Sequence, residues 1–506
     1  MRDVLGKPSS AISEPRERRM VWWLCGFAAV HVFIFSSAFP FFNIVDEASH
    51  FDLVVKYSQG AIPRTMEPFS AQAIPHIIAF QTHEYFWPPT VFPDGKIPPP
   101  IWTLPIESAV ERLKTYKAYF TKELNHESSQ PPCYYLLAGI WWRWAKPLGL
   151  PDSLLLYSVR FLNIFFVMAM VWLGHIAARL VFPEKAFVRI GVPAVLAAFP
   201  QTAFYSIQND VLSPLCFGAA FICLVKWQRE ELPGIRLGIA TGTALAATYL
   251  TKASNLPLIG VSAMVILFAS RRLIKTAKWR EGLPALLALG LCAGLPIGGW
   301  MMWCKYHFGD LTGSATKIQL LGWTAKTFGD WWQHPLFTSH GLWTFLSNLM
   351  ATFWQGEFLW QRRPLSIPLL NLIYAITSLC LIAVGTASLY PTRAAPAPTQ
   401  RQALWLAFWS LAAAIGFLAF LSIIYDFHDC FYPSRDHPYF TSGRLMLGAL
   451  IPFLLLLFQG IDRTLSCFKN QWVRPLALGA IVLFMLISEI VTDWPVFPNP
   501  YNWFHM

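Results

Sequence analysis

Long apolar stretches separated by short polar connectors recur from one end of the chain to the other. Each stretch is about as long as the ~20 residues that an α-helix needs to cross a bilayer. The pattern predicts an all-α polytopic membrane protein, a single transmembrane domain over residues 1–506 with about 11 spanning helices. These spans are predicted near residues 21–42, 154–181, 187–206, 211–228, 235–251, 253–270, 283–303, 366–390, 402–425, 442–460 and 474–492.

Basic residues indicate which side each connector faces. Arg2, Lys7 and the basic residues at 16–19 precede the first span, which predicts a cytoplasmic N-terminus. That span is too long for a signal-peptide core and lacks a small-residue cleavage site, so we expect it to be retained. Counting spans from there puts the C-terminus outside and every later basic connector in the cytoplasm. These connectors lie at 179–189, 229–236, 271–280, 393–401 and 463–474.

Residues 133–145 would reverse this count if they crossed the membrane. The segment is short, and Arg143 and Lys146 stand beside three tryptophans, so we predict an amphipathic helix lying in the outer interface. The first external loop then covers residues 43–152, and a second large external loop covers 304–365. Loops of this length are usually functional.

The composition fits a membrane protein, since 55% of residues are hydrophobic and 13% are charged, against roughly 25% charged in soluble domains. The formal charge of +11 does not indicate nucleic-acid binding, because the basic residues lie between apolar segments rather than on one face. The nine cysteines form no CxxC pair, so no zinc or redox site of that kind is expected. A Cys304–Cys430 disulfide is a minor alternative, if both residues lie outside.

The first polar group follows the first span and contains Asp46, Glu47 and His50. Carboxylates at a membrane boundary are costly unless they are solvated, paired or bound to a metal. The group therefore indicates either a hydrated helix end or the mouth of a functional site.

The second group, His126, Glu127 and Gln130, stands just before two prolines that end regular structure and fix the direction of these side chains. The alternative is a capping segment at the start of the interfacial helix. Because Gln130 occupies the fourth position after His126, the group is not an HExxH zinc site.

The third group lies at predicted outer helix ends and consists of Asn209, Asp210, Lys252 and Arg444. Either cation alone indicates ordinary snorkelling toward lipid headgroups. Two cations on the same side as Asp46, against the positive-inside bias, favour phosphate binding. A Trp-rich segment around Glu357 either stacks on a sugar or anchors in the interface.

The ordered set of motifs resembles the GT-C superfamily of membrane glycosyltransferases, and most nearly a bacterial membrane-protein family of unassigned function within it. The motifs are DEASH at 46–50, ESSQPPCYY at 127–135, QNDVL at 208–212, KASNLP at 252–257, TFWQGEF at 352–358 and SGRLM at 442–446. The chain departs from the pattern at Leu445, where a tyrosine is usual, and at Glu357, near a position often held by a small residue. The resemblance covers nearly the whole chain and implies a GT-C-like helix bundle.

The resemblance also implies an inverting glycosyltransferase in the bacterial cytoplasmic membrane. The donor would be a polyprenyl-phosphate sugar, and a lipid, glycan or protein would accept the sugar on the outer face. Asp46 is expected to be the catalytic base, with Glu47 beside it, while Lys252 and Arg444 bind the leaving phosphate. Substrate contacts are expected from His50, His126, Glu127, Gln130, Asn209 and Asp210.

A divalent cation such as Mg²⁺ or Mn²⁺, held by Asp46, Glu47 and Glu127, is an open alternative at this site. A transporter or flippase of a lipid-linked or polyanionic substrate is the competing function. It would require charged groups near the membrane midplane and broken helices in paired halves.

Overall fold

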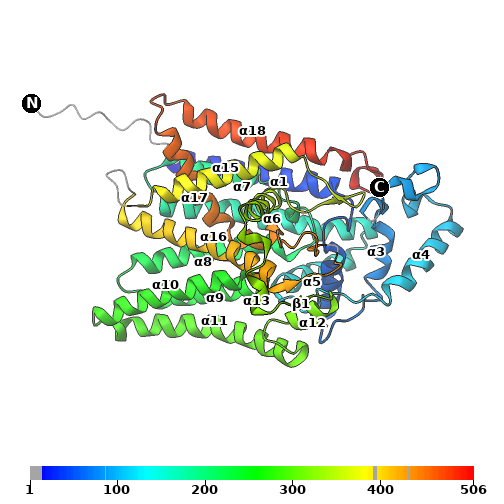
Figure 1. Cartoon of the computed structure of the whole chain (residues 1–506), viewed down its shortest axis with the longest axis horizontal. Coiled ribbons are helices and arrows are strands. Elements are labelled where there is room, and N and C mark those ends of the chain that lie inside the picture. Colours follow the sequence, from blue (N-terminus) through cyan, green and yellow to red (C-terminus); the bar gives the residue numbers. More distant parts are fainter. Residues whose placement is uncertain (1–13, 86, 391–395, 431) are drawn as a thin grey trace, which may run out of the picture.

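The computed structural model describes residues 14–85, 87–390, 396–430 and 432–506. Its helices run along the long axis of an elongated bundle, and α3 and α4 extend beyond one end (Figure 1). Within the described residues, nine helices are long and apolar enough to cross a membrane, which confirms an all-α polytopic membrane protein. They are α1 (Glu14–Ala38), α6 (Asp152–Val181), α8 (Ser213–Arg229), α10 (Leu256–Lys275), α11 (Trp279–Phe308), α15 (Pro368–Ala387), α16 (Pro398–Ile424), α17 (Leu450–Leu465) and α18 (Val473–Asp493), some of them lengthened by a 3₁₀ turn.

The two other predicted spans are shorter helices. The first is α7 (Ala186–Ala197), with 12 residues, and the second is α9 (Ile235–Thr251), with 17 residues. At 1.5 Å per residue, α7 covers only about 18 Å of a ~30 Å hydrocarbon core. It ends early because Pro200 cannot continue a helix and disfavours helical backbone at Phe199. Both helices are still packed into the bundle, α7 against α1, α6 and α17, and α9 against α8 and α11.

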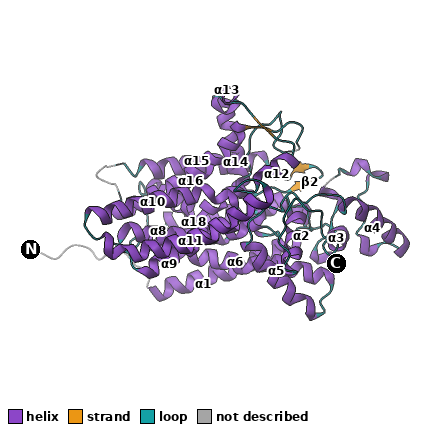
Figure 2. Cartoon of the chain, turned by 90° about the horizontal axis from the view of Figure 1, so that it is seen from below, coloured by secondary structure: helices purple, strands orange, loops and turns teal. Residues whose placement is uncertain are grey.

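The segments between the spans carry the remaining helices. Residues 43–152 contain α2 (Glu47–Ser58), α3 (Ile74–Phe80), α4 (Ile106–Phe120) and α5 (Cys133–Ala145). Residues 304–365 contain α12 (Ser314–Leu320), α13 (Phe328–Trp331) and α14 (Ser339–Gln355), and α13 stands out from the side of the bundle (Figure 2). The predicted interfacial helix is thus α5, which packs against α2 and α6.

Short elements complete the connections between the helices. Two antiparallel strand pairs form, β1 (Thr324–Ala325) with β4 (Tyr425–Asp426) and β2 (Leu359–Trp360) with β3 (Arg363–Pro364). The 3₁₀ turns are η1 (His83–Tyr85), η2 (Pro89–Val91), η3 (Pro93–Gly95), η4 (Ile101–Thr103), η5 (Lys146–Leu148), η6 (Thr202–Phe204), η7 (Asn209–Leu212), η8 (Ala253–Asn255), η9 (Pro335–Phe337), η10 (Gly443–Ala449), η11 (Trp494–Val496) and η12 (Trp503–His505).

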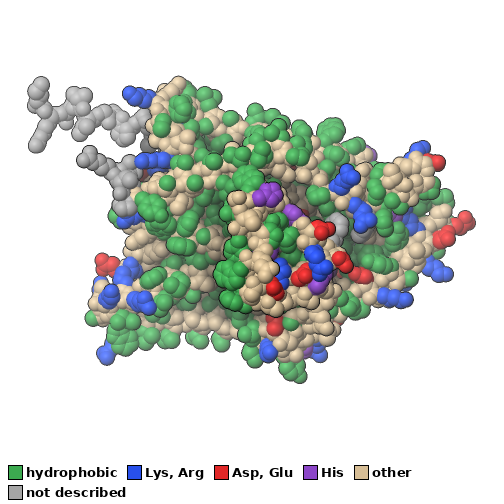
Figure 3. All heavy atoms as spheres, viewed as in Figure 1, with side chains coloured by type: hydrophobic (Ala, Val, Ile, Leu, Met, Phe, Trp, Pro, Cys, Tyr) green, Lys and Arg blue, Asp and Glu red, His purple; other side chains and the backbone are tan. Residues whose placement is uncertain are grey.

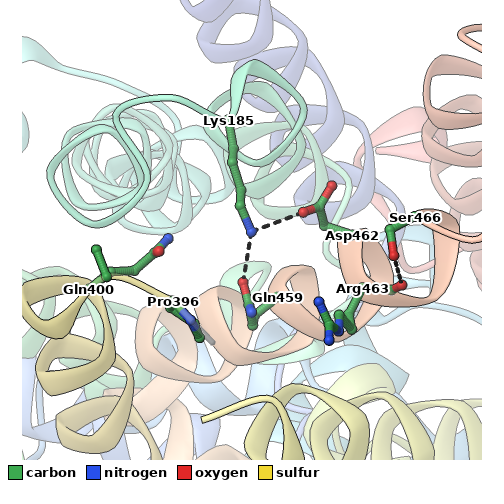
Figure 4. Close-up of a pocket in the computed structure, with 8 residues that line it drawn as sticks. Lys185, Pro396, Gln400, Gln459, Asp462, Arg463 and Ser466 are labelled. Carbon is green, nitrogen blue, oxygen red and sulfur yellow. Dashed lines mark hydrogen bonds and ion pairs between the residues drawn. The ribbon is translucent and has the colours of Figure 1, made fainter. Parts of the chain in front are cut away.

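The connectors predicted to be cytoplasmic meet at one end of the bundle. Lys185, before α7, lies 2.9 Å from Asp462 near the end of α17, beside a cavity of about 300 Å³ (Figure 4). Arg179, near the end of α6, pairs with Glu14, the first residue of α1, at 2.8 Å. Of the basic residues behind the topology prediction, Arg2, Lys7 and Arg393 lie outside the described residues.

A buried ion pair joins the ends of several helices on the opposite side of the bundle. Arg160 of α6 donates to Glu47 through Nε and Nη2, both at 2.7 Å, and neither side chain is exposed. Arg160 also donates to the carbonyl oxygens of Ser36 and Pro40 where α1 ends. Glu47 in turn accepts the backbone N–H of Ile207. The turn from α1 into α2 and the segment before α8 are therefore fixed to the same guanidinium.

Replacing Arg160 with methionine should destabilise the protein strongly. The change leaves the Glu47 carboxylate charged and unpaired in the interior, which costs about 3–5 kcal/mol. The matched control is Arg179→Met, which removes an ion pair whose side chains are 48% and 58% exposed, so that water already screens it and its loss should change stability little. Thermal unfolding of both purified variants tests this, and equal losses of stability would contradict the assigned role of Arg160.

A reporter domain fused after Lys146 should report the outer side of the membrane. This follows because α5, with 13 residues, covers only about 20 Å and is too short to span. The measurement is an activity that depends on the compartment of the reporter, compared with a fusion after Arg229. A cytoplasmic signal after Lys146 would overturn the predicted topology.

Candidate functional site

Arg444 connects three carboxylates from separate parts of the chain. It lies in η10 just before α17, and its guanidinium contacts Asp46 at 2.5 Å, Glu357 at 3.0 Å and Asp210 at 3.5 Å. Gly443 allows this approach, because a Cβ atom there would lie 2.1 Å from the backbone nitrogen of Phe353. Three segments that are far apart in the sequence therefore converge on one side chain.

Asp46 is held between Arg444 and His126. Its backbone is left-handed, with φ of 65°, a conformation that aspartate tolerates better than most residues. Oδ2 accepts from Arg444, and Oδ1 lies 3.0 Å from Nε2 of His126. Burial alone would raise the pKa of Asp46, but the Arg444 guanidinium, followed by His126, holds it well below its usual range. The side chain remains 19% exposed, so a ligand can reach it.

Glu127 is the second acid of the cluster and lies almost fully buried. Its carboxylate accepts from Lys317 at 2.5 Å and Gln130 at 2.5 Å, and His126 lies 3.4 Å away. Burial is the largest single effect and raises the pKa of Glu127, but the Lys317 ammonium, together with His126 and His50, outweighs it and lowers the pKa. Lys317 comes from α12, within residues 304–365, and no pattern in the sequence connects this lysine with the site.

Asp210 and Lys252 form a third part of the same cluster. Nζ of Lys252 lies 2.6 and 2.5 Å from the two carboxylate oxygens of Asp210, and both side chains are buried. Asn209 donates to Gln130 at 3.2 Å, which joins this pair to Glu127. The structure thus brings together the predicted helix-end residues and the predicted His126 group.

Glu357 completes the cluster from the loop between α14 and α15. It accepts from Ser442 at 2.6 Å as well as from Arg444. Burial outweighs the nearby Arg444 charge and raises its pKa. The predicted Trp-rich segment therefore contributes a carboxylate at the centre of the site.

The side chains of two predicted site residues form no hydrogen bond with this cluster, although His50 lies close enough to Glu127 and Asp46 to interact with their charges. The Glu47 carboxylate, expected to act beside Asp46, is enclosed by Arg160 and backbone N–H groups, which gives it a structural position. His50 is buried in α2, where Nδ1 lies 2.6 Å from the hydroxyl of Tyr135 and Nε2 has no hydrogen-bond partner. Cys304 and Cys430 are both free, so the alternative disulfide is not formed.

The cluster balances its charges. Four carboxylates meet one arginine, two lysines and one histidine: Asp46, Glu127, Asp210 and Glu357 face Arg444, Lys252, Lys317 and His126. Side chains of both signs and histidines gather near the middle of the face seen in Figure 3. The 23-residue stretch Gly443–Leu465 begins at this cluster, and at 1.5 Å per residue it separates the cluster from the Lys185 cavity by roughly 30 Å.

Fold and site together define a polytopic α-helical membrane protein with one ionic cluster at the mouth of its bundle. A family model described as "Predicted membrane protein (DUF2142)" matches residues 27–426, and the protein belongs to this family. The matched range includes Asp46, His126 and Lys252 and ends before Arg444. A comparison with curated proteins finds no match.

Among solved structures, the chain is similar to ArnT from Cupriavidus metallidurans bound to undecaprenyl phosphate. The identity is 13%, the alignment covers 88% of this chain and 79% of ArnT, and the TM-score is 0.35. A TM-score of this size does not establish a common fold.

His50, which is buried, and His126, which is partly exposed, should give opposite pH dependences of stability. Burial lowers the pKa of His50 from 6.5 to about 4, so its stabilising neutral form is lost as pH falls through that interval. At about 1.4 kcal/mol per pKa unit, the loss is on the order of 3 kcal/mol.

For His126, burial opposes protonation, but the hydrogen bond to Asp46 and the neighbouring carboxylates raise the pKa above 6.5. Its contribution is therefore complete below pH 6.5 and is lost as pH rises through the higher folded-state pKa. Thermal unfolding between pH 4 and 9 checks both signs. His50→Gln should remove the decline on the acid side, and His126→Gln the decline on the alkaline side; an unchanged profile in either variant contradicts that assignment.

Proposed function

We propose that the protein is an inverting glycosyltransferase that uses a polyprenyl-phosphate sugar as donor. The observation that supports this most directly is Asp46, a partly exposed carboxylate whose two oxygens face Arg444 and His126. A base for an acceptor hydroxyl and a cation for a phosphate leaving group are the two requirements of this reaction. The ordered GT-C-like motifs along the chain support the same proposal.

The proposed reaction is a single displacement. Asp46 removes the proton from an acceptor hydroxyl as its oxygen forms a bond to the anomeric carbon of the donor sugar. The bond from that carbon to the phosphate oxygen breaks, and its electron pair stays on the lipid phosphate. Arg444, assisted by Lys252, then stabilises the additional negative charge, as preorganised cations do in a site that excludes bulk water.

Ligand-free Asp46 is a weak base because Arg444 holds its pKa low. A donor phosphate competes for the same guanidinium, which has 11% of its side chain exposed. Drawing Arg444 away removes the strongest interaction that favours the charged carboxylate, so Asp46 becomes more basic when the donor binds. Donor binding therefore prepares the base for the acceptor.

The other residues of the cluster have supporting roles in this proposal. His126 and Gln130 lie at the accessible side of Asp46 and Glu127 and orient the acceptor. Asn209 and Asp210 hold Gln130 and Lys252 in place. Glu47 acts indirectly, because its pairing with Arg160 fixes the turn that carries Asp46.

The proposed setting is the outer face of the bacterial cytoplasmic membrane, with the N-terminus in the cytoplasm. A lipid-linked donor supplies activated sugar on a side where nucleotide sugars are absent. The acceptor is a lipid, glycan or protein, and the donor lipid enters from the bilayer beside the cluster. All cluster residues lie at the end of the bundle opposite Lys185, which suits one-sided chemistry.

Transport or flipping of a lipid-linked substrate is the competing function, and one observation bears on it. His31 of α1 and Glu489 of α18 form a buried pair at 2.7 Å inside the bundle, and ionisable groups in membrane spans often mark a substrate path. His31 lies seven residues before the end of α1, about 10 Å by helical rise. That depth is about two thirds of the way to the middle of a ~30 Å bilayer, so the pair is compatible with transport. We favour transfer because Asp46 faces both Arg444 and His126.

Asp46→Asn should abolish sugar transfer from a polyprenyl-phosphate hexose or pentose while leaving the fold intact. Removing a general base typically costs about 10²–10⁴-fold in rate, and asparagine tolerates the left-handed backbone at this position. The measurement is transfer by purified protein in liposomes, with thermal unfolding as the check on folding.

Asp94→Asn is the matched control, because Asp94 is an exposed residue of the same external loop.

Arg444→Lys should raise the KM for the donor more than it changes kcat, because lysine keeps the charge but loses the planar guanidinium that binds a phosphate through two N–H groups. Full activity of the Asp46 variant would refute the catalytic assignment. Lipid movement across liposomes without any transfer would favour the flippase.

A further inference from the structure

Three side chains of the cluster lie close enough together to surround a metal ion. One ligand atom from each of Asp46, His126 and Glu127 lies within 4.8 Å of the others. The sequence had suggested Asp46, Glu47 and Glu127, but Glu47 is paired with Arg160. With an imidazole in the set, Zn²⁺ or Mn²⁺ would suit these ligands better than Mg²⁺.

Each carboxylate of this set already has a cationic partner. Asp46 accepts from Arg444, and Oε1 of Glu127 lies 2.5 Å from the ammonium of Lys317. Oε2 of Glu127 accepts from Gln130. A divalent ion at the shared position would lie a few ångströms from two like charges in a largely buried site, where such repulsion is weakly screened. The residues present therefore do not fit a metal while Lys317 is in place.

The position of Lys317 is determined by close packing of its loop. Gly313, with φ of +71°, directly precedes α12, and a Cβ atom there would lie 2.8 Å from Cβ of Ser129. Asp310 accepts the backbone N–H groups of Thr312 and Ala315, which shapes the turn before the helix. The ammonium is thus brought to Glu127 by a preformed loop that lies directly on the segment preceding α5.

We propose that Lys317 is a built-in cation that takes the place of a divalent metal at Asp46, His126 and Glu127, and that it keeps metals out. The lysine supplies one positive charge where these ligands would otherwise gather a metal ion. The flexible side chain of lysine lets its charge move when a substrate binds, whereas a coordinated metal ion would stay fixed. Only one consequence rests on the proposed function: transfer by the wild-type protein should be insensitive to chelators.

The test measures metal binding, so its outcome does not depend on sugar transfer. Wild-type protein, Lys317→Ala and the control Lys114→Ala, an exposed lysine of α4, are stripped with EDTA. Each is then titrated with Mn²⁺ and, separately, Zn²⁺, with bound Mn²⁺ followed by its EPR signal and stability by thermal unfolding. Lys317→Ala should gain one saturable site that binds at least about tenfold more tightly than any site in the wild type.

Two further variants identify the site. Adding Glu127→Gln to Lys317→Ala should remove the gained binding, because it deletes a ligand. Gly313→Ala should produce part of the gain with Lys317 still present, since the new Cβ displaces α12 from Ser129. The proposal is overturned if wild-type protein binds the metal as tightly as Lys317→Ala, or if neither Lys317→Ala nor Gly313→Ala gains a site that Glu127→Gln abolishes.

Discussion

The ion pair between Glu47 and Arg160 is the interaction on which the rest of the site depends. Taking both charges out of water is costly, and the cost is recovered only when every lone pair and N–H has a partner. Here Arg160 reaches the carbonyl oxygens that end α1, while Glu47 accepts from the backbone before α8. These contacts therefore hold the turn between α1 and α2 in place. Asp46 is the residue at that turn, so its direction is set by its neighbour.

The two adjacent acids show how environment separates chemistry from structure. Asp46 is partly exposed, and so are the two side chains that contact it, Arg444 and His126. A ligand can therefore reach these contacts and replace them. Glu47 has no exposed surface and has hydrogen-bond partners on both oxygens. A carboxylate can exchange partners only where solvent or a ligand can replace what it loses. For that reason one of them suits a reaction and the other holds the fold.

Much of the fold could be predicted because it depends on local patterns. The length of apolar runs located the spans, and the shortness and charge of residues 133–145 identified α5 as a separate helix. α7 was predicted too long, because the apolar run continues past Pro200 while the helix stops. Apolar character alone cannot distinguish a helix from the extended segment that follows it.

The site was only partly predictable, for a related reason. Asp46, His126, Asp210, Lys252 and Arg444 stand where apolar runs end, so their position in the chain made them visible. Arg160 lies within a span, and Lys317 stands in a polar loop where a lysine is unremarkable. Their roles arise from contacts across more than one hundred positions of sequence. Such contacts depend on tertiary packing, which periodicity and charge patterns do not encode.

The balance of four acidic and four basic side chains in the cluster has a consequence for how a ligand would be found. A neutral group of charges has little field beyond the Debye length of about 8 Å at physiological ionic strength, so it does not attract soluble anions from a distance. A molecule anchored in the bilayer is already confined near the mouth of the bundle, and confinement raises its effective concentration without any new contact. Such a site favours anchored anions over free anions because the bilayer confines the anchored ones near it. This preference arises before the site contacts any atom of the headgroup.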